Sequence, residues 1–92
     1  SKIAVEVKTV FNDYDAAKVV NRARVDADDA STDLFRAEKD GKNVAGAKTK
    51  LTELRALSQS AKQAFEERFG KDIDDYMKEQ GYTTETNPYK GM

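Results

Sequence analysis

The chain contains no cysteine, no histidine and no tryptophan among its 92 residues. Without cysteine it cannot form a disulfide framework or thiolate metal sites, and without histidine it lacks the commonest general base and zinc ligand. Any catalysis would have to use carboxylate, Lys, Ser or Tyr side chains. Histidine-dependent catalysis and zinc sites built from cysteine or histidine are therefore excluded.

Neither sign of charge dominates, because 16 basic and 17 acidic residues leave a formal net charge of −1. No net field attracts nucleic acid or an anionic membrane. No apolar run approaches the roughly 18 residues of a membrane span, and no charged-then-apolar secretion signal is seen at the start. We therefore expect no membrane partner and a cytoplasmic protein, or one incorporated into a virion if it belongs to such an assembly.

The fraction of hydrophobic residues is also low: they make up 38% of the chain, and charged residues make up 36%. This is polar for a globular domain but too apolar for wholesale disorder. A domain of this size buries only about 60–65% of the surface of its unfolded chain, so its core is thin. We expect an elongated protein, or a homo-oligomer that completes its core with another copy.

A helical stripe between about residues 13 and 39 is the clearest pattern in the chain. Asn12 or Asp13 can cap its start, and Asp40-Gly41 provides a left-handed stop. Its apolar residues recur at alternating three- and four-residue steps. They are Ala16, Ala17, Val20, Ala23, Ala27, Ala30, Leu34 and Ala37.

A second stripe, with heptad-like and thus coiled-coil-like spacing, runs over about residues 44–69 and can end at Gly70. It consists of Val44, Ala47, Leu51, Leu54, Ala61, Phe65 and Phe69. Only the short link 40–43 joins the two stripes, and such a short connection folds neighbouring helices back antiparallel. The sequence therefore predicts an all-α fold built on a long antiparallel helical hairpin.

The remaining segments give weaker patterns. Residues 2–11 suit either a strand or a helix, and we favour a helix because no second strand-like segment exists to pair with it. A short third helix is predicted over about residues 72–80, with Asp72 as its cap. Residues 1–81 then form a single helical domain, and residues 82–92, with the only proline and two glycines, form an extended or flexible tail.

No motif in the chain indicates catalysis, a cofactor or a metal. The segment Asp26 to Asp33 is rich in oxygen ligands, but it lies inside a helical stripe and lacks the glycine and ligand spacing of a calcium loop. The glycines do not form a phosphate-binding loop, and no histidine is present to activate a serine. We therefore predict no enzyme activity and no catalytic, cofactor-binding or metal-binding residues.

Aromatic and other apolar residues outside the main stripes, or at their outer edges, suggest contact with another protein. The candidate interaction surface comprises Val25, Phe35, Leu57, Phe65, Phe69, Tyr76, Met77, Tyr82 and Tyr89. An equally simple reading is that Phe35 packs over the turn and Tyr82 covers the end of the hairpin.

A second candidate surface is a basic tip at the turn of the hairpin. It comprises Arg36, Lys39, Lys42, Lys48 and Lys50. These residues could contact phosphates, but no interleaved aromatic is placed to stack on a base, and lysine near a helix C-terminus is expected from the helix dipole alone.

Three functional hypotheses follow. The first is a non-enzymatic interaction or structural subunit that self-associates and contacts a partner protein, as an accessory piece of a larger assembly such as a phage particle. The second is a small regulator that binds and inhibits a host protein. The third is a nucleic-acid-binding module that uses the basic tip. The nearly neutral net charge makes nucleic acid the least favoured partner.

Overall fold

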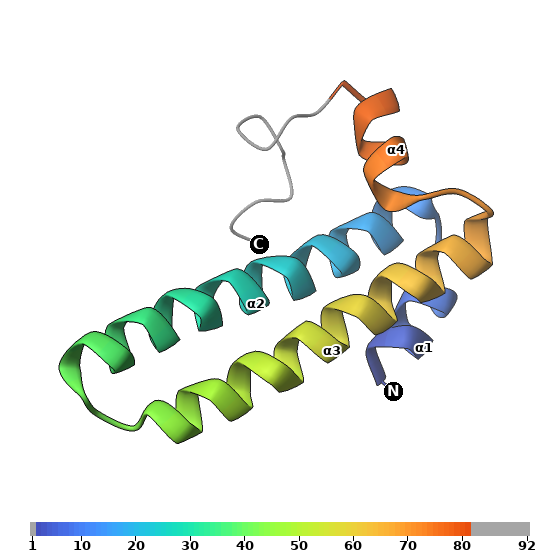
Figure 1. Ribbon diagram of the computed structural model, residues 1–92. Helices are drawn as coiled ribbons and strands as arrows, with labels where there is room; N and C mark the ends of the chain where they lie inside the picture. Colours follow the sequence, from blue (N-terminus) through green and yellow to red (C-terminus); the bar gives the residue numbers. More distant parts are fainter. Residues whose placement is uncertain (1, 82–92) are drawn as a thin grey trace.

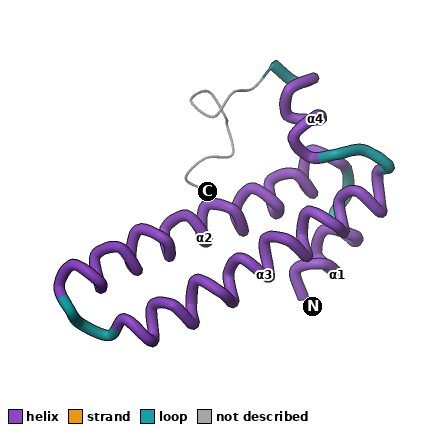
Figure 2. The backbone as a smooth tube through the Cα atoms, in the orientation of Figure 1, coloured by secondary structure: helices purple, strands orange, loops and turns teal. Residues whose placement is uncertain are grey.

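A computed structural model describes residues 2–81, which form four helices and no strand (Figure 1, Figure 2). The helices are α1 (Lys2–Thr9), α2 (Asp13–Asp40), α3 (Val44–Phe69) and α4 (Ile73–Glu79). The long helices α2 and α3 lie side by side and run antiparallel (Figure 1). The predicted all-α hairpin is confirmed, while the predicted tail 82–92 lies outside the described residues.

Local signals define both ends of α2. At its start, Asn12 is the N-cap, and its side-chain oxygen accepts a hydrogen bond from the backbone N–H of Asp15 at 2.9 Å. At its end, Gly41 adopts a left-handed conformation with φ 66°, and its N–H donates to the carbonyl of Ala37. The three-residue link 41–43 then reverses the chain into α3, with Asn43 also at positive φ.

The transition from α3 to α4 uses the same devices. Gly70 has φ 67°, and its N–H donates to the carbonyl of Glu66 at 2.8 Å. Asp72 caps α4 by accepting hydrogen bonds from the N–H groups of Asp74 at 2.8 Å and Asp75 at 3.2 Å. The predicted short third helix is therefore confirmed, with Asp72 as its cap.

Residues 2–9 form a helix, which settles the alternative between helix and strand for this segment. Val7 is fully buried. The Arg68 guanidinium of α3 donates to the carbonyl of Val7 at 3.0 Å and reaches the carbonyl of Phe11 at 3.5 Å. Because the last carbonyls of a helix have no partner within it, Arg68 caps α1 from another helix.

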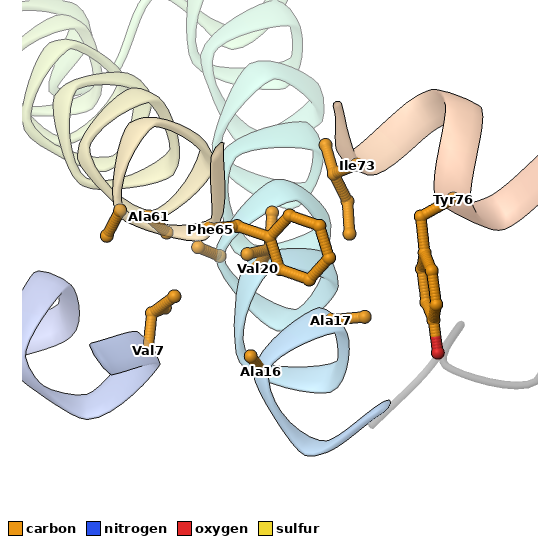
Figure 3. Close-up of a cluster of buried hydrophobic side chains, with 10 residues drawn as sticks. Val7, Ala16, Ala17, Val20, Ala61, Phe65, Ile73 and Tyr76 are labelled. Carbon is orange, nitrogen blue, oxygen red and sulfur yellow. The ribbon is translucent and has the colours of Figure 1, made fainter. Parts of the chain in front are cut away.

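The main core lies at the base of the hairpin, where all four helices meet (Figure 3). Phe65 of α3 is fully buried at its centre, with ring centroids 5.0 Å from Phe69 and 5.6 Å from Tyr76. The facing side of α2 carries alanine and valine, so small residues meet a large one and the helices approach closely. The cluster consists of Val7, Ala16, Ala17, Val20, Ala23, Ala61, Ala64, Phe65, Ile73 and Tyr76.

Ion pairs between the elements surround this core. Those within the described part of the chain are Lys8–Glu67 at 2.6 Å, Arg24–Asp74 at 2.8 Å, Lys71–Asp13 at 3.1 Å and Lys62–Asp72 at 3.8 Å. The first three link residues at least 50 positions apart in the sequence, and together the four pairs attach α1, α4 and the link before α4 to the hairpin. The base is thus held by both packing and paired charge.

Candidate interaction surface

Beyond the base, the hairpin continues as two helices alone. We call residues 25–60, which lie beyond the core cluster on both long helices, the distal arm (Figure 1). Only Ala27, Ala30 and Leu51 are buried in this segment. The stripe residues Leu34 and Leu54 are only half-buried, because neither α1 nor α4 reaches them. The distal arm therefore lacks the second layer that a helical hairpin needs to complete a core.

Two residues predicted to contact a partner lie in the core instead. Phe65 is fully buried and Tyr76 is 3% exposed, so neither belongs to an exposed surface. Phe69 and Met77 are partly buried against the same cluster. The cause is the base itself: α1 and α4 supply Val7 and Ile73 to the cluster around Phe65 (Figure 3).

Other predicted surface residues are accessible on the distal arm. Phe35 of α2 is 68% exposed and Leu57 of α3 is 38% exposed, whereas Val25 is half-buried. The simpler interpretation, in which Phe35 packs over the turn, is therefore wrong, because the side chain is largely exposed. The candidates Tyr82 and Tyr89 fall outside the described residues.

Sequence reasoning missed exposed residues at the start of the chain. Phe11 is 88% exposed, Val5 60% and Tyr14 42%. Val7, Phe11 and Tyr14 have the spacing of one helical face, but α1 ends at Thr9 and α2 begins at Asp13, so Phe11 lies in the link. The capping signal of Asn12 was the available hint, because an N-cap implies that the residue before it is not helical.

The five residues of the candidate basic tip lie on both sides of the turn between α2 and α3. Arg36 and Lys39 lie near the end of α2, Lys42 lies in the link, and Lys48 and Lys50 lie near the start of α3. All five side chains are exposed. None forms an ion pair within the part of the chain that the structure describes.

An acidic segment of α2 precedes this tip. Asp26, Asp28, Asp29 and Asp33 are all exposed, and no basic residue lies between them on the helix. Lys50 lines an open groove of about 390 Å³ together with Asp26, Asp29 and Asp33 but forms no ion pair with them within residues 2–81. The four ion pairs found among residues 2–81 all lie at the base, and none involves a residue of the distal arm.

The described surface has open grooves rather than an enclosed cavity. A second open groove, about 340 Å³, is lined by Ser31, Ser58 and Arg55 together with the carboxylate-bearing Asp28, and among residues 2–81 no side-chain hydrogen bond joins Asp28 to either serine. Across residues 2–81, no three acidic side chains gather to hold a metal ion.

Comparison of the chain with protein-family models, curated proteins and solved structures finds no match. Among the described helices, none has both the length and the apolar character needed to cross a membrane.

Proposed function

We propose that this protein is a non-enzymatic helical interaction subunit whose distal arm associates with another copy of the chain. One observation supports the proposal above others: the arm extends from a packed four-helix base as a bare two-helix layer. Within residues 25–60 only two alanines and one leucine are buried. A second copy would supply the missing layer.

The apolar residues left uncovered on the arm favour this reading. Phe35 and Leu57 are exposed, and Leu34 and Leu54 are half-buried. Covering apolar surface contributes about 25 cal/mol per Å² removed from water. Closed two-fold symmetry is the commonest arrangement by which identical chains cover such surfaces.

Light scattering coupled to size exclusion tests the proposal on the full chain. At tens of micromolar, the measured mass should exceed the 10.3 kDa of one chain, and the melting temperature should rise with protein concentration. Phe35→Ser should shift the protein toward monomer. Phe11→Ser removes an even more exposed phenylalanine, which lies at the base, and should leave association unchanged.

A strictly monomeric protein, with a melting temperature independent of concentration, would contradict self-association. The small regulator of a partner protein would then be the better hypothesis, and so would attachment to a larger assembly through a different chain. Capture of a single dominant partner protein would support the regulator hypothesis.

The basic tip supports nucleic-acid binding as a second candidate, because its five basic side chains are exposed and unpaired within the described residues. The acidic segment beside the tip opposes phosphate binding. Fluorescence anisotropy with a labelled DNA or RNA duplex distinguishes the two: a nucleic-acid complex would lose affinity steeply with salt.

A further inference from the structure

One side of α2 in the distal arm carries a regular exposed row. Asp28, Thr32, Phe35 and Lys39 follow one another at steps of four, three and four residues, which places them on one side of the helix. All four are exposed. This row is distinct from the buried alanines of α2 that pack toward α3.

The charges along this row are ordered. Asp28 and Asp29 precede Phe35, and Arg36 and Lys39 follow it. At 1.5 Å per residue, Asp28 and Lys39 are about 16 Å apart along the helix, and Asp29 and Arg36 about 10 Å. An acidic end, an exposed aromatic ring and a basic end therefore follow in sequence on one helical surface.

Such an order is complementary to itself in only one direction. If two copies of α2 lie parallel and in register, acid faces acid and base faces base. If they lie antiparallel, the acidic end of each copy faces the basic end of the other. In the antiparallel arrangement Asp28 of one copy faces Lys39 of the other, and Asp29 faces Arg36. The midpoint of each pair along the helix lies near residue 33, so a single register of the two helices forms both.

We propose that two copies dock α2 against α2, antiparallel and about a two-fold axis near residue 33. Asp28 and Asp29 of each copy then face Lys39 and Arg36 of the other. Phe35 lies within about 3 Å of the axis along the helix, so the two rings are placed at the centre of the contact. This docking mode rests on the proposed self-association. Of the uncovered apolar residues of the distal arm it covers Phe35, whereas Leu54 and Leu57 belong to α3 and lie outside the contact.

The energetic roles of these groups differ. Surface ion pairs each add little affinity, but opposed like charges disfavour the wrong orientation, so the charged rows determine direction and register. The central aromatic residue is the type that contributes most to affinity at interfaces. None of the four charged residues has an ion-pair partner within residues 2–81, so docking breaks no ion pair described there.

Reversal of the charge at one end of the row at a time tests the geometry. One variant carries Asp28→Lys and Asp29→Lys, and the other carries Arg36→Glu and Lys39→Glu. Each variant alone presents like charges to its own copy, and its dimer dissociation constant should rise by at least about 100-fold. An equimolar mixture of the two should recover the dimer mass, because each acidic row again meets a basic one.

The matched control is Lys48→Glu with Lys50→Glu, which makes the same charge change at the tip but on α3. Association of this variant should stay close to that of the unmodified protein. Helical circular dichroism of every variant shows whether it is folded, and recovery in the mixture is itself a readout that an unfolded variant could not give.

The outcomes separate this docking mode from the proposed function. If the unmodified protein self-associates but the charge variants associate equally well, or their mixture recovers nothing, the antiparallel contact is overturned while self-association stands. If the unmodified protein is monomeric at every concentration, both are overturned. A monomer that shifts only on addition of duplex DNA would assign the basic tip to nucleic acid and overturn the docking mode.

Discussion

Arg24 of α2 and Asp74 of α4 form a two-point ion pair, with Nη1 2.8 Å from Oδ1 and Nη2 3.4 Å from Oδ2. The two residues are 50 positions apart in the sequence. Because α4 has only seven residues, few contacts are available to hold it. This pair, together with the buried Ile73 and Tyr76, fixes α4 against the base of the hairpin.

Removal of either partner should lower the free energy of unfolding by about 0.5–1 kcal/mol, since both side chains are partly exposed and solvent screens the pair. Urea melts of Arg24→Ala, Asp74→Ala and the double variant measure this. The double variant should cost less than the sum of the two single changes. Strict additivity would show that the pair contributes no coupling.

Leu51 and Leu54 belong to the same apolar stripe but differ in burial, because Leu51 is 5% exposed and Leu54 lines an open groove. Leu51→Ala should destabilise the protein by about 2–4 kcal/mol, as loss of a buried leucine removes both transfer energy and packing. Leu54→Ala should cost clearly less. Denaturant unfolding at one low protein concentration compares the free energies of unfolding of the two variants. Equal losses would contradict an α3 that buries Leu51 and leaves Leu54 at a groove.

The hairpin could be predicted because its signals are local. Each stripe repeats with the helical period, and the stops at Gly41 and Gly70 are readable from residue type and confirmed by their positive φ. The confirmed cap at Asp72 belongs to the same class. Such features depend on neighbours within one helical turn, which the sequence displays directly.

The features that could not be predicted depend on distant contacts. Ile3, Val5 and Val7 suit both a strand and a helix, so the helix was favoured only for want of a second strand, and the contact that caps it comes from Arg68, a residue about 60 positions away. Phe65 was expected at an exposed edge, but α1 and α4 bury it. The row from Asp28 to Lys39 was not recognised as one surface, because no apolar stripe marks it.

Gly41 ends α2 at φ 66° with nothing within 4 Å of the position that a Cβ would occupy. Gly41→Ala should therefore cost about 1–2 kcal/mol from backbone strain alone, without a steric clash. Gly41→Asn is the matched control, since asparagine tolerates the left-handed region better and should cost less. Thermal melts that rank alanine as no worse than asparagine would contradict this account.

The carboxylate of Asp72 accepts the backbone N–H of Asp75, and this bond is the main reason its pKa lies below the ordinary value of 3.8. The N–H of Asp74 and the nearby Lys62 lower the pKa further, whereas partial burial opposes them. A carboxyl group whose pKa is lower in the folded state stabilises the protein above its unfolded pKa. That stabilisation is lost as the pH falls through the folded pKa.

Asp72→Asn should reveal this dependence, because asparagine is a good N-cap that does not titrate. We expect the unmodified protein to be the more stable of the two at pH 7, and the difference to shrink progressively below about pH 4, as linkage requires. Asp72→Ala, which removes the cap altogether, should cost about 1 kcal/mol at pH 7. Urea melts from pH 7 to pH 2 measure all three proteins. A difference between the unmodified protein and Asp72→Asn that stays constant with pH would show that the charge of Asp72 does not stabilise the start of α4.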